Sequence, residues 1–559
     1  MRALADTLQS LPQGVALLED PIFNRGTAFT LDERTRLRLD GLLPPVVETL
    51  EQQAARAYEA YRRKEDDLER HIYLRALQDT NETLCYAVLR RHLTEMVPVV
   101  YTPVVAQACE KFSQIYRRPR GLFVPYPMRD RLEQLLENRP RGEVDAVVVT
   151  DGERVLGIGD QGAGGMAISI GKLQLYTLFG GVEPSRTLPV LLDVGTNNAA
   201  KLAEPDYIGW RHERVGGDAY FDFVDRFVTA VRRVLPGVLL QWEDFARDHA
   251  APLLERYRDA LCTFNDDIQG TAAVVVAALS GALGVTGGRF RDQRIVIAGA
   301  GSAGIGLAGY ILQAMRSEGV SPEDARQRIL LVDRDGLVHD GQPDLTPGQR
   351  AYAQPAASLA GFRKDEAGRV MLQAVLEQLG ATVLLGVSAV CGLFGEKEVR
   401  AMAARVERPI IFPLSNPLER CEATPTDLLR WTDGRALIAT GSPYAPVTYA
   451  GVTYRIAQCN NVYIFPAVGL GVLGAGARRV TDGMMLAAAR ALGTHSPAKK
   501  DAAAPLLPPL EELLGLTPEI ALAVAREAQD SGMAPASSED AVRSAIAARF
   551  WTPIYRPLL

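Results

Sequence analysis

Short apolar runs alternate with amphipathic segments along most of the chain. The runs DAVVVT (145–150), RTLPVLLDVG (186–195) and GVLLQWED (237–244) are rich in β-branched residues or leucine and end in turn or acidic residues. Such runs are typical of buried parallel strands. Tyr220–Val234, between the second and the third, has helical spacing. The alternation predicts an α/β fold.

A second block of the same kind follows. RIVIAGAGSAGIGLAGYILQAM (294–315) and RILLVD (328–333) open it, and ATVLLGVS (381–388), RPIIFPLS (408–415) and ALIATGS (436–442) continue it as further predicted strands. The first part of the chain differs, because Ala54–Leu93 mixes apolar and charged residues at helical spacing. A proline-rich linker, Ser496–Pro509, precedes a last helical segment.

The glycine pattern GxGxxG occurs at 157–162, 299–304 and 469–474. A dinucleotide site also needs a strand before the turn and a helix after it, and only the match of Gly299, Gly301 and Gly304 has both. The next strand ends in Asp333, where an acid that binds a ribose belongs, although the spacing is longer than usual. The first match carries an acid that would repel phosphate, and the third favours close helix packing.

Two acidic pairs follow apolar runs: Glu243-Asp244 and Asp266-Asp267. The carboxyl ends of parallel strands gather at one edge of a sheet, where carboxylates would repel one another unless a cation holds them. Oxygen ligands without histidine or thiolate indicate Mg²⁺ or Mn²⁺. A single pair is often a solvated helix cap, but two such pairs favour a metal site.

Several polar residues lie in apolar surroundings. Lys172 follows GGMAISIG, so burial would make it a usable base, although most lysines lie at the surface. Tyr101 could be a core tyrosine with a satisfied hydroxyl. Arg154, before the strand-like VLGIG, could hold a carboxylate or form a surface ion pair. Asn416 and the pair Asn460-Asn461 could bind a ligand or cap the backbone.

Composition excludes several classes of protein. The 559 residues carry 61 Lys and Arg against 67 Asp and Glu, a net charge of −6, and 47% are hydrophobic. A disordered chain, a collagen-like repeat and a generically basic nucleic-acid binder are therefore excluded. The six cysteines and six histidines show no zinc-ligand spacing. Scattered cysteines, and a start (MRALADTLQSLPQG) without an apolar core, predict a cytoplasmic protein.

Two uncharged stretches, Ile268–Gly288 and Ile456–Ala477, are each about long enough to cross a bilayer. The first directly follows Asp267 and contains polar residues that suit a helix packed between domains. The second contains the Asn460-Asn461 pair and a proline. We interpret both as the interior wall of a cleft, and we expect no membrane partner.

Long motifs make the chain similar to the malic enzyme family, and closest to its bacterial NAD-linked type. The resemblance covers nearly the whole length and includes LLEDPIFNRGTAFTLDERTRLRLDGLLPP, VPVVYTPVV, YRRPRGLF, VVTDGERVLGIGDQGAGGM, LPVLLDVGTNN, QWEDFA, FNDDIQGTAAV, LSNP and NNVYIFP. It implies oxidative decarboxylation of L-malate to pyruvate and CO₂, with a divalent metal (Mg²⁺ or Mn²⁺) and a nicotinamide cofactor. It also implies a homo-oligomer, a dimer or a tetramer.

The resemblance assigns a role to each candidate residue. Tyr101 matches the family's general acid, Lys172 its general base, and Asp266 the neighbour that interacts with the lysine. Its metal ligands match Glu243, Asp244 and Asp267. The residues that match contacts with malate or the cofactor are Arg154, Asn416, Asn460 and Asn461, and Asp267 is also expected near the cofactor.

Departures from the family pattern keep an alternative open. The chain reads GMAISIGK where the family usually has GMGIPVGK, and Cys459 replaces the glycine before the asparagine pair. The AISIGK form resembles malolactic enzymes, which convert malate to lactate and CO₂ with NAD and Mn²⁺. The motif FNDDIQGTAAV and the C-terminal extension favour malic enzyme. Asp333 favours NAD over NADP, because a carboxylate repels a 2′-phosphate, whereas Arg334 could accept one.

We therefore predict a helical N-terminal region, a parallel-sheet substrate domain and a Rossmann-type NAD-binding domain. The expected boundaries are 1–118 for the first, 119–265 plus about 461–530 for the second, 266–460 for the third, and 531–559 for a C-terminal extension.

Overall fold

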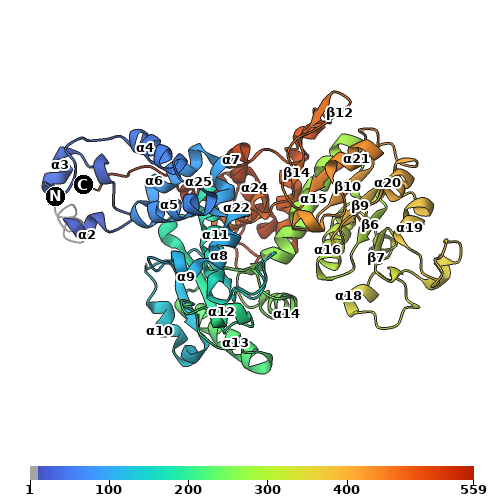
Figure 1. Ribbon diagram of the computed structural model, residues 1–559, viewed down its shortest axis with the longest axis horizontal. Helices are drawn as coiled ribbons and strands as arrows, with labels where there is room; N and C mark the ends of the chain where they lie inside the picture. Colours follow the sequence, from blue (N-terminus) through green and yellow to red (C-terminus); the bar gives the residue numbers. More distant parts are fainter. Residues whose placement is uncertain (1–10, 141, 156, 559) are drawn as a thin grey trace. The chain divides into compact units, whose positions relative to one another are not determined.

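The computed structural model describes residues 11–140, 142–155 and 157–558 (Figure 1). The chain divides into two compact units, 1–246 with 547–559, and 247–546. The finer division into four parts stays a prediction. Residues 1–10, on which the expectation about the start of the chain depends, lie outside the described residues.

The predicted helical segment near the N-terminus is confirmed. It forms α4 (Leu50–Arg62), α5 (Asp67–Thr80) and α6 (Glu82–Arg91), each with a side-chain cap at its start. Two further helices, α7 (Leu93–Val100) and α8 (Val104–Glu110), are separated by a break at Tyr101. Pro103 contributes to this break, because Thr102, the residue before it, is disfavoured in helical conformation.

The first unit contains a parallel sheet with the strand order β1-β3-β2-β4. These strands are β1 (Leu122–Pro125), β2 (Ala146–Thr150), β3 (Thr187–Asp193) and β4 (Leu239–Trp242). Helix α11 (Met166–Leu178) packs on β2 and β3, and α13 (Gly217–Val234) precedes β4. The three predicted strands and the predicted helix are therefore confirmed.

One local prediction in this unit was wrong. The described residues of the run VLGIG after Arg154 form no strand, and Val155 and Gly159 make an isolated antiparallel bridge. Gly157 and Gly159 have φ of 83° and 74°. Two glycines in the left-handed region turn the chain back within a few residues, so the β-branched residues do not continue as a strand.

The second unit contains a larger sheet with the order β14-β11-β10-β9-β6-β7-β8. Its strands are parallel except for β8 at one edge, which is antiparallel to β7. They are β6 (Ile295–Ala298), β7 (Ile329–Asp333), β8 (Gly336–Leu337), β9 (Val383–Gly386), β10 (Ile410–Pro413), β11 (Leu437–Thr440) and β14 (Ala457–Gln458). The order reverses between β6 and β9, as in doubly wound dinucleotide-binding folds.

Alternate residues of this sheet build a hydrophobic core on one face. Val296, Leu330, Leu384, Ile411 and Ile438 pack there against buried residues of three helices, which lie together beside the sheet in Figure 1. The helices are α19 (Leu372–Leu379), α20 (Glu396–Ala403) and α21 (Pro425–Trp431). Helix α16 (Ser302–Ser317) contacts β6 and β7. The predicted Rossmann-type arrangement is confirmed.

The two uncharged stretches form buried helices within the second unit. The first forms a short π-helix, η5 (Asp266–Gly270), and α15 (Thr271–Thr286), which packs against α16 and against α23 (Asp482–Thr494). In the part of the chain that the structure describes, 266–286 is the one helix long and apolar enough to cross a membrane, and 72% of its most apolar window is buried in the protein. A buried helix in the core of a protein can have the same length and apolar composition.

The second stretch includes α22 (Phe465–Ala475), which packs on α24 (Leu510–Asp530). A Cβ on Gly471 would lie 2.5 Å from the Ala521 carbonyl oxygen, so only a glycine lets the two helices come this close. The third GxGxxG match is therefore a helix-packing motif, as expected.

Candidate functional site

Lys172 and Glu243 form a buried ion pair in the first unit. The side chains are 1% and 2% exposed, and Lys172 Nζ lies 3.0 Å from Glu243 Oε1. Lys172 comes from α11 and Glu243 from the residue after β4. The interpretation of Lys172 as a surface lysine is wrong, since the whole side chain lies inside the protein.

Tyr101 contacts the same carboxylate oxygen. Its hydroxyl donates to Glu243 Oε1 at 3.3 Å, and Lys172 Nζ lies 5.2 Å from the centre of its ring. Gly171 makes this approach feasible, because a Cβ there would lie 3.0 Å from the Val100 carbonyl oxygen and 3.1 Å from the Tyr101 ring. A candidate acid and a candidate base thus meet at one oxygen.

Glu243 and Asp244 are not solvated helix caps. They are 1% and 3% exposed at the carboxyl end of β4, and the backbone N–H of Arg154 donates to the Asp244 carbonyl oxygen at 3.1 Å. Asp244 has φ of 55°, a left-handed conformation that aspartate tolerates better than most residues. Two buried carboxylates side by side, with no histidine or thiolate in the pair, suit a hard divalent cation.

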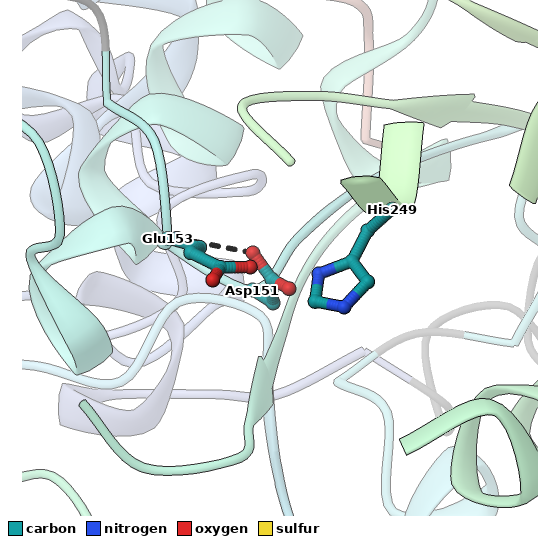
Figure 2. Close-up of side chains that lie close together, drawn as sticks. All are labelled: Asp151, Glu153 and His249. Atoms are coloured by element: carbon teal, nitrogen blue, oxygen red, sulfur yellow. Dashed lines mark hydrogen bonds between the residues drawn. The ribbon is translucent and has the colours of Figure 1, made fainter. Parts of the chain in front are cut away.

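The loop that follows β2 holds further charges, some of which sequence reasoning missed. Figure 2 shows Asp151 accepting a hydrogen bond from the backbone N–H of Glu153, at 3.0 Å. Asp151 also accepts from the Tyr220 hydroxyl at 2.7 Å, and burial raises its pKa. In the first GxGxxG match, Asp160 pairs with Arg214 at 2.8 Å. That acid therefore has a structural role, while the Arg154 side chain is exposed.

In the second unit, Asp266 and Asp267 begin η5, directly after β5 (Thr263–Asn265). Asp266 is fully buried and Asp267 half-buried. The Asn461 amide donates to the backbone oxygen of Asp266 at 3.1 Å and to its Oδ2 at 3.0 Å. Gly270 is required here, since a Cβ would lie 1.9 Å from Asp266 Oδ1. One asparagine of the predicted pair thus orients an acid of the predicted cluster.

The other two asparagines have different surroundings. Asn460 caps the short helix η9 (Asn461–Tyr463) by accepting from the Val462 N–H at 3.0 Å. Asn416 is exposed and accepts a hydrogen bond from the Ser442 hydroxyl. The chain leaves the sheet core after Pro413 and carries Asn416 to the surface.

The predicted dinucleotide turn has the expected geometry. Gly299, with φ of 115°, follows β6, and α16 begins at Ser302. A Cβ on Gly304 would lie 1.9 Å from the Gly299 carbonyl oxygen, whereas one on Gly301 would meet nothing within 4 Å. The outer glycines are therefore needed for packing, and Gly301 leaves open space where a pyrophosphate can approach the backbone.

Asp333 ends β7, the strand next to β6. It is half-buried and accepts from the Arg334 N–H at 2.9 Å. The Arg334 side chain is 89% exposed and lies 3.4 Å from Asp335. The carboxylate at the strand end is thus the more enclosed of the two charges.

A buried carboxylate that sequence reasoning missed joins two loops at this edge of the sheet. Glu422 is fully buried and accepts from the Ser388 N–H at 2.8 Å and from the Ser415 N–H at 3.3 Å. Its only signal in the sequence is its place shortly after the LSNP motif.

A glycine turn between a strand and a helix in one α/β unit, and a buried cluster of lysine, tyrosine and carboxylate in the other, are typical of a dinucleotide-dependent enzyme. Residues 78–258 match the family "Malic enzyme, N-terminal domain", and residues 268–529 match "Malic enzyme, NAD binding domain". The chain belongs to the malic enzyme family. The predicted resemblance is confirmed.

Individual relatives agree with this assignment. The chain is 54% identical over 543 residues to an NAD-dependent malic enzyme of Edwardsiella ictaluri and 52% identical to one of Shewanella loihica. Both matches cover 97% of this chain and 96% of the relative.

Solved structures support the fold. Malic enzyme from Entamoeba histolytica has a TM-score of 0.56 at 21% identity and covers 92% of this chain and 90% of its own. The Pyrococcus horikoshii enzyme has a TM-score of 0.53 at 24% identity and covers 82% and 89%.

Proposed function

We propose that the protein catalyses the oxidative decarboxylation of L-malate to pyruvate and CO₂ with reduction of NAD. The observation that carries this proposal is the meeting of Tyr101 and Lys172 at one oxygen of Glu243. Relatives more than 50% identical over nearly the whole chain carry the name NAD-dependent malic enzyme. A binding or scaffold protein would not need this buried cluster.

The proposed chemistry uses an acid and a base at adjacent carbons. A bound nicotinamide would accept the hydride from C2 of malate, and Lys172, in its neutral amine form, is proposed to accept the proton of the C2 hydroxyl. The bond between C3 and the C4 carboxylate then breaks, CO₂ leaves, and Tyr101 delivers a proton to C3. One proton is taken and one is given, so pyruvate forms with no net change in the protonation of the pair. Asp266 is proposed to interact with the lysine.

A divalent cation fits the donor set of buried carboxylates. We propose Glu243, Asp244 and Asp267 as ligands of Mg²⁺ or Mn²⁺, which would supply Lewis-acid polarisation of the C2 oxygen. All three are oxygen donors, and the first two are almost completely buried. Arg154, Asn416, Asn460 and Asn461 are proposed to contact malate or the cofactor.

For the cofactor we propose NAD rather than NADP. Gly299, Gly301 and Gly304 would receive the pyrophosphate, with Asp267, Arg154, Asn416 and Asn460 as further contacts. The half-buried Asp333 carboxylate would bond a ribose 2′-hydroxyl and repel a 2′-phosphate. The exposed position of Arg334 and its ion pair with Asp335 support the same choice.

We further propose that the protein is cytoplasmic and forms a homo-oligomer. All six cysteines are free thiols, which suits a reducing compartment. The oligomeric state rests on the family resemblance, and light scattering after gel filtration measures it directly.

The test is an assay with malate, Mn²⁺ and either NAD⁺ or NADP⁺, in which reduced cofactor and organic products are both measured. We expect NADH and pyruvate to accumulate, with much slower reduction of NADP⁺. Lactate without NADH would instead identify a malolactic-type reaction. No CO₂ release with any metal would leave only a nucleotide-binding role.

A further inference from the structure

The strand β4 carries one polar side chain in a fully buried apolar run. Gln241 is 0% exposed and lies two residues before Glu243. Residues two apart on a strand point to the same face of the sheet. Gln241 Nε2 donates to Glu243 Oε2 at 2.8 Å.

The other end of the Gln241 amide is held as well. The Tyr176 hydroxyl donates to Gln241 Oε1 at 2.5 Å, and this tyrosine is also 0% exposed. A carboxylate only accepts hydrogen bonds, so the amide must present its nitrogen to Glu243 and its oxygen to Tyr176. Glu243 thus sets which way the amide faces, and the Tyr176 hydroxyl holds the amide oxygen in that orientation.

The chain of bonds reaches both carboxylate oxygens of Glu243. One carboxylate oxygen receives Lys172 and Tyr101, and the other receives Gln241. Tyr176 lies four residues after Lys172, so both extend from one face of α11. A single helix therefore supplies the proposed base for one oxygen and the anchor of the amide that holds the other.

We propose that Gln241, oriented by Tyr176, is a positioning residue that sets the Glu243 carboxylate for metal binding. The inference rests on the proposed function, in which Glu243 is a metal ligand. Hydrogen-bond partners of metal ligands fix the ligand's orientation, and their loss typically lowers metal affinity by about 10–100-fold. A glutamine that only satisfied its own buried polar groups would affect stability and leave metal affinity unchanged.

The experiment measures Mn²⁺ binding directly, by the electron paramagnetic resonance signal of free Mn²⁺ in a titration of the full-length protein. Gln241→Met keeps the length of the side chain and removes both hydrogen bonds. Tyr176→Phe removes only the hydroxyl and decides the question if the first variant does not fold. Ser169→Ala is the matched control, because Ser169 is a buried polar residue of α11 that bonds the Val190 carbonyl instead.

We expect the Mn²⁺ dissociation constant to rise about tenfold or more in Gln241→Met. The rise should be smaller in Tyr176→Phe and absent in Ser169→Ala, and all variants should keep wild-type NAD⁺ affinity. Wild-type Mn²⁺ affinity in both test variants, with lower stability alone, would overturn the positioning role. A wild-type protein that binds no Mn²⁺ would instead overturn the metal role of Glu243 itself.

Discussion

Glu243 is the residue that contacts both the proposed base, Lys172, and the proposed acid, Tyr101. A buried ammonium and a buried carboxylate each lose several kcal/mol of hydration, which is regained only with close geometry and further hydrogen bonds. Glu243 has the Lys172 contact at 3.0 Å and bonds from Tyr101 and Gln241. Apolar side chains would fill this space at lower cost, so the cluster is better explained by catalysis than by stability.

Replacing Lys172 tests the proposed base. Lys172→Ala should lower kcat with malate by about 10²–10⁴-fold, the usual contribution of a general base. The protein should still fold, with a lower free energy of unfolding because Glu243 loses its cation. Steady-state kinetics and urea unfolding measure the two effects. Lys397→Ala, which replaces an exposed lysine, is the control. A wild-type kcat in Lys172→Ala would refute the role of Lys172 as the base.

Replacing Asp267 tests the one proposed metal ligand that belongs to the second unit. Asp267→Asn keeps the side-chain volume of this half-buried residue and removes its negative charge. The Mn²⁺ concentration for half-maximal activity should rise at least about tenfold, since hard cations prefer carboxylate over amide oxygen. A titration curve that overlays the wild type would exclude Asp267 as a ligand.

At the scale of an element, two glycines of the turn between β6 and α16 are predicted to have different roles. Gly304 is needed for packing, and Gly301 is needed for NAD⁺ binding. Gly304→Ala would place a Cβ 1.9 Å from a carbonyl oxygen and should destabilise the protein by about 1–3 kcal/mol. Gly301 has φ of −79°, which alanine adopts freely, and open space beside it. Gly301→Ala should therefore fold normally and bind NAD⁺ more weakly. Thermal unfolding and calorimetric titration distinguish the pair, and unchanged NAD⁺ affinity in Gly301→Ala would contradict the assignment.

The contact between α5 and α7 should make stability depend on pH. Buried His71 bonds the Val99 carbonyl at 2.8 Å, and burial lowers its pKa from 6.5 to about 4. As the pH falls below 6.5, His71 takes up a proton in the unfolded chain but stays neutral in the folded protein. The free energy of unfolding is therefore highest above pH 6.5 and decreases as the pH falls toward 4. The loss from pH 7 to pH 5 should be about 2 kcal/mol. His71→Gln should lack this component in urea unfolding, and an equal loss in both proteins would contradict it.

The elements were predicted well where one local pattern decides the structure. Strands β2, β6 and β7 and the turn at Gly299 follow from apolar runs and glycine spacing. The strand predicted after Arg154 was wrong, because two glycines in the left-handed region turn the chain there despite the β-branched residues beside them. Gln241 was missed because a sequence does not show which polar residue of an apolar run meets a distant hydroxyl. Such contacts depend on how α11 and β4 pack.

At the scale of the whole molecule, the two ends of the chain belong to one unit. Residues 547–559 join 1–246, and the Tyr555 hydroxyl donates to Gln53 Oε1 at 2.7 Å and accepts from Asn81 at 2.8 Å. The C-terminal segment is thus part of the unit that carries Tyr101 and Lys172. The proposed cofactor turn lies in the other unit, so the proposed reaction needs residues of both.

The proposed reaction is tested most directly by the stoichiometry of one reaction mixture with malate, NAD⁺ and Mn²⁺. Released CO₂, NADH and the organic product are measured over the same time course. We expect one NADH and one pyruvate for each CO₂, with all three lost in Lys172→Ala. Release of CO₂ with lactate and without NADH would show that the reaction is not oxidative decarboxylation. Full activity in Lys172→Ala would show that Lys172 is not the base.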